Sequence, residues 1–174
     1  ANPYLVEDAA DLNAVRNNLS ACYKQVNDID LSSWGNWTPI GGITNPIAFK
    51  GTYDGNGKKI KNLNISLIAA RQNVIYHLGL FAYNKGTIQK VNLENINISL
   101  NTEDQVRVGT LCGYNEGLIV ACCAINIKID DYSRVHSGGE GIGGLVGFIA
   151  GSTSTIINSF TTGIIDMHST GNIN

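Results

Sequence analysis

Carboxylates that stand close together are the residues of this sequence that could do acid–base chemistry. Asp28 and Asp30 would project from one face of a strand, and two acids held in a cleft with shifted pKa values can cleave a glycosidic bond. The other carboxylates considered are Asp54, Glu103, Asp104, Asp130 and Asp131. No cluster converges along the sequence, so we expect solvated residues of turns and rims and no catalytic site.

Metal ligands are sparse as well. The loop 54–57 (Asp-Gly-Asn-Gly) begins as a calcium loop does, but the further carboxylates and the closing Glu are missing, so it predicts a corner turn. The histidines have no metal-ligand spacing to one another or to a cysteine, and we expect surface or loop residues at His77, His136 and His168. The sequence predicts no metal and no cofactor.

Four cysteines fit an oxidising compartment, and they are Cys22, Cys112, Cys122 and Cys123. Cys122 and Cys123 are adjacent in a predicted strand, so Cys122 should face inward and Cys123 outward. In the repeat described below, Cys22 lies about 10–15 Å along the axis from the others, too far for a disulfide. Cys22 could instead meet Cys123 of a neighbouring subunit, while Cys112 and Cys122 either pair within one coil or remain free.

Two tryptophans and four sequons are candidates for surface contacts. Trp34 and Trp37 either pack against a helix or offer flat faces to a carbohydrate. The Asn-x-Ser/Thr acceptors, which are about as frequent as chance gives in so Asn-rich a sequence, are Asn18, Asn36, Asn64 and Asn97.

An internal repeat determines the elements that would position these residues. Residues 111–129 match residues 80–98 at 8 of 19 positions without a gap, and a looser third copy begins at residue 143. Within each unit apolar residues alternate with polar ones, as in Lys90-Val91-Asn92-Leu93, which is the period of a strand. Such units, repeating every 28 to 35 residues or roughly so, indicate a β-solenoid in which each coil covers the apolar side of the next.

We therefore predict a single all-β domain over residues 1–174, with about four to five coils over residues 23–174. Glycine and β-branched residues are too frequent over 40–174 for helices. The core residues expected in stacked columns are Ile60, Leu63, Ile88, Val91, Leu93, Ile96, Ile98, Ile119, Cys122, Ile127, Ile129 and Ile156.

One helix is predicted over residues 6–20, ahead of the coils. Apolar residues recur there at spacings of three and four, at Leu5, Ala9, Leu12, Val15 and Leu19. Such a helix would cap the open apolar end of the first coil. No corresponding cap is visible after the strand that ends near residue 167.

The composition favours a secreted or cell-surface protein. A net charge of -2 and 15% charged residues leave no basic patch for nucleic acid. No apolar run reaches the roughly 20 residues that span a bilayer. The sequence opens with Ala-Asn-Pro, which we interpret as a mature terminus after signal cleavage.

A family resemblance rests on the order of several short segments. Asp-Ile-Asp-Leu at 28–31, Trp-Thr-Pro-Ile-Gly at 37–41, Phe-Lys-Gly-Thr-Tyr-Asp-Gly at 49–55, Leu-Gly-Leu-Phe at 78–81 and Gly-Gly-Leu-Val-Gly at 143–147 resemble bacterial and archaeal surface proteins built on GLUG-motif repeats. The resemblance implies a right-handed parallel β-helix displayed outside the cell, and no known enzymatic activity. The sequence departs from the pattern at 148–151, where Asn would be expected before the Gly.

Two functions remain open from the sequence. An uncapped last coil would stack on another subunit by its end, or subunits would pack laterally, giving a homo-oligomeric filament, sheath or surface layer. Alternatively the solenoid is an adhesin or binding module, a fragment of a longer surface protein, whose loops at 32–47 and 131–141 contact a glycan or host protein.

Overall fold

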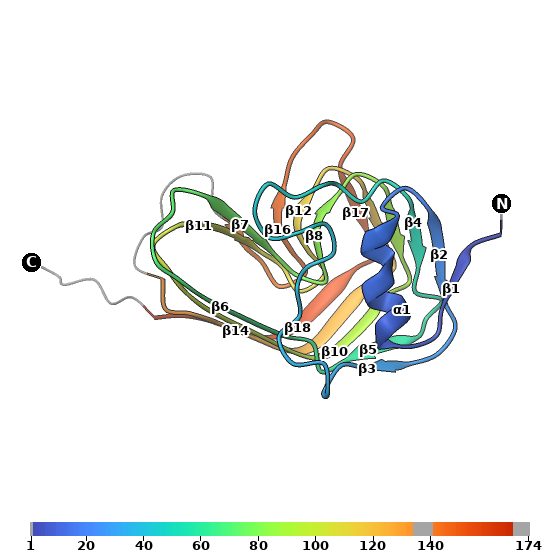
Figure 1. The fold of residues 1–174 in the computed structure, drawn as a ribbon, viewed down its shortest axis with the longest axis horizontal. Helices are drawn as coiled ribbons and strands as arrows, with labels where there is room; N and C mark the ends of the chain where they lie inside the picture. The colour runs from blue at the N-terminus through green and yellow to red at the C-terminus, as the bar shows by residue number, and fades with distance from the viewer. Residues whose placement is uncertain (1, 134–140, 169–174) are drawn as a thin grey trace, which may run out of the picture.

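The chain is a parallel β-solenoid of about four turns with a short helix near its N-terminus (Figure 1). The computed structural model describes residues 2–133 and 141–168. Among them, each complete turn passes in order through four parallel sheets, here named A, B, D and C. The all-β solenoid predicted from the repeat is confirmed.

The strands of each sheet come from successive turns. Sheet A contains β1 (Tyr4–Val6), β2 (Cys22–Gln25), β4 (Thr52–Asp54), β9 (Thr87–Gln89), β13 (Leu118–Val120) and β17 (Thr155–Ile157). Sheet B contains β3 (Ile29–Asp30), β5 (Lys59–Lys61), β6 (Asn64–Ala69), β10 (Asn92–Thr102), β14 (Cys123–Asp131) and β18 (Phe160–Met167). Sheet C contains β8 (Phe81–Asn84), β12 (Cys112–Asn115) and β16 (Val146–Ile149). Sheet D contains β7 (Ile75–Leu78), β11 (Gln105–Val108) and β15 (Gly141–Ile142).

The turns stack in register, so equivalent side chains form columns. Ile98 of β10 pairs with Ile65 of β6 on one side and with Ile129 of β14 on the other, and all three are buried. Because neighbouring strands lie about 4.8 Å apart, each side chain contacts its equivalents directly. One apolar core therefore runs along the axis.

Eleven of the twelve predicted core residues are buried, which confirms the prediction at those positions. Ile156 of β17 is only partly buried, although it pairs with the buried Ile119. Ile156 lies in the last turn, where no further strand of the described residues covers it.

Asparagine holds one corner of the solenoid in a left-handed conformation. Asn62, Asn95 and Asn126 follow one another through the turns with φ of 61°, 58° and 55°. Asn126 donates from Nδ2 to Oδ1 of Asn95 at 2.6 Å, and Asn95 donates to Asn62 at 3.4 Å. Asn tolerates this conformation better than other residues with a Cβ, so the repeated Asn both permits the corner and links the turns.

A second asparagine column is buried inside the turn from sheet C to sheet A. Asn84 donates from Nδ2 to Oδ1 of Asn115 at 2.8 Å, and Asn115 donates to Oγ of Ser154 at 2.8 Å. In the last turn Ile149 pairs with Asn115, so Ser154 supplies the polar partner there. The departure from the repeat at 148–151 is thus compensated locally.

The cap helix is shorter than predicted. Residues 9–14 form α1 (Ala9–Ala14) and continue as the 3-10 helix η1 (Val15–Asn17), whereas residues 6–20 were expected to be helical. The helix begins after Asp8, the N-cap, whose side chain accepts hydrogen bonds from two backbone N–H groups. Residues 4–6, before this cap, pair with β2 as strand β1. Leu5 is therefore exposed, while Leu12 and Val15 are buried over the first turn as expected of a cap.

Replacing a core isoleucine by aspartate tests the inward columns. Ile96→Asp should lower the free energy of unfolding by about 4 kcal/mol or more, because an unpaired charge would enter the core. Asn101→Asp, on the exposed face of the same strand, should change it by less than about 0.5 kcal/mol. Urea unfolding followed by far-ultraviolet circular dichroism measures both, and equal effects would contradict the assigned faces.

The corner at residue 121 offers a stabilising substitution. Ala121 has φ of 53° and is exposed, and Asn158 occupies the equivalent corner one turn later. Ala121→Asn should raise the free energy of unfolding by about 0.5–1 kcal/mol, since Asn adopts positive φ at lower cost than Ala. Ala70→Asn, at an exposed position without positive φ, should not stabilise the chain in the same urea titration.

Candidate functional site

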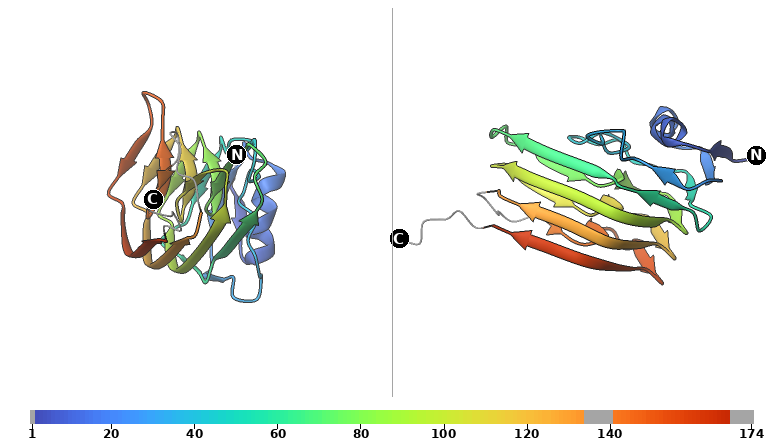
Figure 2. Two further views of the ribbon diagram at one scale, coloured as in Figure 1. Left: turned by 90° about the vertical axis from the view of Figure 1, so that its left-hand side faces the viewer. Right: turned by 90° about the horizontal axis from the view of Figure 1, so that it is seen from below.

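The C-terminal end of the solenoid presents its last turn without a covering strand. Strands β15, β16, β17 and β18 are each the last of their sheets among the described residues. Figure 2 shows β18 at one outer edge of the stack and α1 at the opposite end. We call residues 146–167, from β16 to β18, the open coil.

The open coil is rich in exposed apolar side chains. They are Ile149, Ile157, Phe160, Ile164, Ile165 and Met167. Inside the sheet, Ile165 pairs with Ile129, which is buried, so Ile165 is exposed because the stack ends. Burying one such side chain stabilises a protein or complex by about 1.5–3 kcal/mol. Association that covered this end would therefore be favoured by the hydrophobic effect.

Two of these side chains interrupt the polar outer face of sheet B. Phe160 pairs with Cys123, which pairs with Asn92, and it is 57% exposed. Ile164 follows Lys128 and Asn97 in another outward column and is 58% exposed. The earlier turns place mostly polar side chains at these positions, and the last turn replaces them with apolar ones. A strand apolar on both faces is typical of a buried strand.

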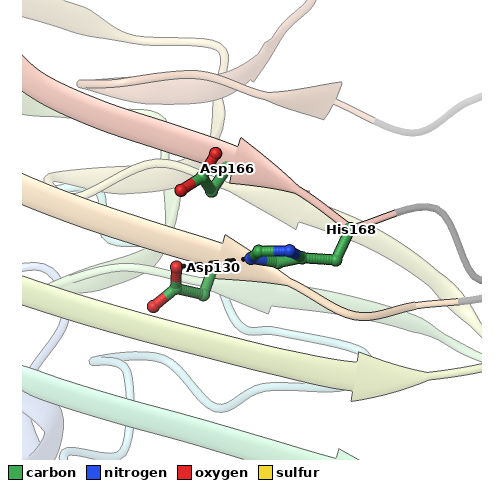
Figure 3. Close-up of side chains that lie close together, drawn as sticks. All are labelled: Asp130, Asp166 and His168. Atoms are coloured by element: carbon green, nitrogen blue, oxygen red, sulfur yellow. Dashed lines mark ion pairs between the residues drawn. The ribbon is translucent and has the colours of Figure 1, made fainter.

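A mixed cluster of two carboxylates and a histidine lies beside the open coil (Figure 3). Asp130 of β14 pairs in register with Asp166 of β18, and the ring of His168 reaches back toward Asp130. Ligand atoms of all three residues lie within 4.8 Å of one another, and Nε2 of His168 is 3.7 Å from Oδ1 of Asp130. The ring of Tyr132 stacks on His168 at 4.3 Å between centroids.

This cluster has the donor types that could hold a divalent cation, but it already has a cationic partner. Nζ of Lys128 lies 2.7 Å from Oδ2 of Asp130, and this ion pair lowers the pKa of Asp130. Asp166 also contributes to raising the pKa of Lys128. The positive charge of Lys128 therefore offsets much of the negative charge of Asp130 and Asp166 without a metal ion.

The sequence placed the carboxylate pair 130–131 at a solvated rim, which the structure corrects, whereas His168 is exposed as expected of a surface or loop histidine. Pairing of Ile129 with Ile165 brings Asp130 opposite Asp166, and this register is the signal that could have revealed the cluster. Asp131 and Asp104 are also buried rather than solvated. Asp104 accepts hydrogen bonds from the backbone N–H groups of residues 72 and 73, so its carboxylate serves as a loop anchor.

A polar cavity of about 630 Å³ lies on the outer side of sheet D. Its lining includes Pro46, Arg71, His77, Glu103 and Gln105, drawn from three successive turns. The cavity combines cationic, anionic and amide groups with apolar side chains such as Val74 and Ile75, a composition suited to ligands that carry both polar and apolar groups.

His77 was expected at the surface but is 6% exposed. Its backbone N–H donates to the carbonyl of Ile43 at 2.8 Å, and Arg107 donates from Nη1 toward its Nε2 at 3.3 Å. Burial and the nearby Arg107 charge lower the pKa of His77 to about 4. His77 is therefore neutral near pH 7. His136, the third histidine of the sequence, lies outside the described residues.

Aromatic rings form a ladder beside His77. Tyr83 and Tyr114 stack at 4.7 Å between centroids, and Phe148 follows at 5.7 Å from Tyr114. The guanidinium of Arg107 lies 4.6 Å and 4.5 Å from the ring centroids of Tyr114 and Phe148. Because the ring faces contact one another and Arg107, this ladder stabilises the stack rather than offering free faces to a ligand.

The four cysteines form no disulfide within the chain. Cys122 is buried and Cys123 is part-exposed, and Cys123 pairs with Asn92 as the repeat predicted. Cys22 is exposed near the capped end. Burial raises the pKa of Cys112 to about 12 and that of Cys122 to about 11, so these two thiols are poor nucleophiles.

The tryptophans differ in their exposure. Trp37 is buried, donates from Nε1 to the carbonyl of Leu80 at 3.2 Å, and lies 5.7 Å from the guanidinium of Arg16 in η1. Trp34 is 37% exposed and contacts Trp37 at 5.7 Å between centroids. Packing against the cap region therefore accounts for Trp37, and only Trp34 offers surface to a ligand.

The sequons lie in different environments. Asn18 is exposed at the end of η1. Asn36 is exposed, but its side chain is bound to the backbone of Ser66 by two hydrogen bonds. Asn97 donates from Nδ2 to Oδ1 of Asn64 at 2.9 Å on the outer face of sheet B. The Oδ1 of Asn18 accepts from the backbone N–H of Ser20 at 3.3 Å, so all four side-chain amides already form hydrogen bonds within the chain.

Comparison with known proteins gives two related sequences, and no protein-family model matches the chain. Halomucin of Haloquadratum walsbyi is 35% identical over 158 residues, which are 84% of this chain and 2% of halomucin. A candidate Gly-rich membrane protein of Evansella cellulosilytica is 34% identical over 127 residues, or 68% of this chain and 14% of that protein. The chain thus spans only a small part of each relative.

A solved structure shares the architecture. The crystal structure of a candidate immunoglobulin A1 protease from Bacteroides ovatus superposes with a TM-score of 0.51 and 14% sequence identity. The match covers 95% of this chain and 77% of that one. At this identity the likeness shows the fold alone, namely the β-solenoid. In the part of the chain that the structure describes, no helix is long and apolar enough to cross a bilayer.

The buried neutral His77 should give stability a specific pH dependence. Its pKa rises from about 4 when folded toward its ordinary value near 6.5 when unfolded, so the unfolded chain binds more protons between these values. Stability should therefore fall as the pH falls from about 6.5 to 4. His77→Gln, which keeps an acceptor for Arg107, should remove nearly one proton from the uptake on unfolding near pH 5. Urea unfolding at a series of pH values measures this difference, and identical pH slopes would refute it.

Proposed function

We propose that this chain is a non-enzymatic structural module of an extracellular or cell-surface protein and that it assembles through its open coil. One relative is named a membrane protein and another a halomucin, and these names, with the low charge and high Asn content, support a place at the surface. We extend the proposal to membership of the GLUG-motif repeat family, which the recurring Tyr-Asn-x-Gly of β8 and β12 supports.

The single observation that carries the assembly role is the asymmetry of the two ends. Part of the first turn is covered by α1, whose Leu12 is fully buried, whereas among the described residues no element covers the last turn, and Phe160, Ile164 and Met167 are more than half exposed. Exposed apolar patches with free strand edges are the usual route by which β-structure recruits further strands.

Catalysis has little support in the described residues. The buried carboxylate Asp104 binds backbone N–H groups, Asp130 binds Lys128, and the buried thiols have raised pKa values. The two carboxylates therefore have structural partners, and the buried thiols are poor nucleophiles.

A ligand-binding role is the second candidate, and the cavity on sheet D favours it. Arg71, Glu103 and Gln105 would supply hydrogen bonds to a polar ligand such as a glycan. Assembly ranks first because six large apolar side chains of the open coil are exposed together, whereas the charged and amide groups of the cavity can be hydrated by water.

Charged substitutions in the open coil test the assembly role. The wild-type chain should show a molar mass that increases with concentration between about 1 and 100 µM, and Phe160→Glu with Ile164→Glu should remain monomeric. Light scattering coupled to size-exclusion chromatography gives the mass. The matched control is Ile68→Glu on β6, because Ile68 is 82% exposed but β6 is separated from β18 by β10 and β14 in sheet B, and it should associate like the wild type. A wild type that stays monomeric throughout would refute assembly.

A further inference from the structure

We propose that the cavity on sheet D, together with a smaller hollow beside it, is the binding site of an uncharged oligosaccharide. The volume of the cavity, about 630 Å³, lies within the range of about 300–1,000 Å³ that is typical of ligand sites. This site rests on the ligand-binding role proposed above and does not depend on assembly through the open coil, so the two can fail separately.

A departure from the repeat builds the cavity. Five residues, 70–74, separate β6 from β7, whereas two residues separate β10 from β11 in the next turn. Ala69 pairs with Thr102 before this corner. Ile75 pairs with Gln105 after it, so the strands on either side stay in register. Residues 70–74, which we call the inserted corner, are therefore an addition that the stacking of the turns does not require.

A buried carboxylate holds the inserted corner in place. Asp104 is 4% exposed and accepts hydrogen bonds from the backbone N–H groups of residues 72–74 at 2.7, 2.7 and 3.4 Å. Because three consecutive N–H groups bind one carboxylate, this wall of the cavity is already ordered before a ligand arrives. The same N–H groups are no longer available to pair with an extended peptide, so recognition here must come from side chains.

The side chains around the cavity suit hydroxyl groups. Arg71 is exposed, and its Nε donates to Oδ1 of Asn73 at 3.0 Å, which uses one of the five donors of the guanidinium. Glu103 is exposed and only accepts, while the amides of Asn45 and Asn73 provide donors and acceptors. A sugar hydroxyl both donates and accepts, so this mixture of groups can bind neighbouring hydroxyls of one ring.

The charges of the lining favour an uncharged ligand. Its exposed charged residues are Arg71 and Glu103, which have opposite signs. His77 is neutral near pH 7, and the carboxylate of Asp104 is buried against the inserted corner. An acidic sugar would share the cavity with two carboxylates, and a basic sugar would share it with the guanidinium. Neutral hydroxyl groups avoid both repulsions.

The smaller hollow extends the site, which favours linked sugar rings over a single ring. Its volume is about 300 Å³, and it shares Arg71 and Glu103 with the cavity. Ile68 provides apolar surface in the hollow, and Val74 and Ile75 provide it in the cavity. Such side chains can cover the C–H faces of sugar rings. A ligand that occupied both hollows would contact both charged residues.

Binding to immobilised oligosaccharides tests the ligand class. The neutral probes are cellotetraose, mannotetraose, maltotetraose and chitotetraose, set beside the acidic tetragalacturonic acid and the basic, fully deacetylated chitotetraose. At least one neutral probe should bind, and its affinity should exceed that of both charged probes and of its own monosaccharide by about tenfold or more. An uncharged peptide of Gly, Ser and Asn should not bind.

Two substitutions locate the site. Arg71→Met and Glu103→Ala should each weaken binding of that neutral probe by about tenfold or more, because each removes hydrogen bonds to a charged group. The matched controls Lys50→Met and Glu7→Ala change exposed residues that line neither hollow, and both should bind like the wild type. All four positions are exposed, so the midpoint of urea unfolding should stay at the wild-type value.

The site should work in a single chain. The variant with Phe160→Glu and Ile164→Glu, which changes only the open coil, should bind the neutral probe with wild-type affinity. Loss of binding in that variant would overturn a site formed by one chain. No binding of any neutral probe, tighter binding of a charged probe or of the peptide, or binding that Arg71→Met or Glu103→Ala leaves unchanged would overturn the proposal. None of these results decides whether the open coil associates.

Discussion

Parallel stacking in register is the interaction on which the rest of this structure depends. Each inward residue is covered by the same position of the turn before and the turn after, as Ile98 is by Ile65 and Ile129. No turn can bury its own apolar side, so stability is shared between neighbours along the axis. At the two ends an inward residue has a neighbouring turn on one side only, so its other side must be covered by a different element or stay exposed.

The same constraint applies to polar residues and explains their repetition. A buried amide is acceptable only when it is hydrogen-bonded, and the Asn84–Asn115 column satisfies this condition because each turn supplies the partner of the next. The register also brings like charges together. Asp130 and Asp166 lie opposite one another, and Lys128 and His168 gather beside them.

Sequence alternation was sufficient to predict the solenoid and nearly all of the core, because a period of two and a repeat of the whole unit leave little freedom of register. Other features depend on contacts between turns that the sequence does not display. The burial of His77 comes from a loop of an earlier turn and from Arg107, and the cluster around Asp130 exists only once Ile129 and Ile165 are aligned. The helix was predicted too long because Leu5 and Val6 belong to strand β1, although Leu5 fits the apolar spacing of the helix. The apolar outward positions 160 and 164 were visible as a loss of alternation, but only the earlier columns show that polar residues belong there.

Hydrogen exchange resolved strand by strand, at low and high protein concentration, tests most directly the claim that stacked turns hold the fold with one end closed and one open. The amides of β10 and β14 should exchange most slowly, and those beside the α1 cap should be protected at both concentrations. The amides of β18 should exchange rapidly in dilute solution and become protected as the concentration rises. Equal protection of β18 and β14 in dilute solution, or exchange at the α1 end as fast as at β18, would contradict the account.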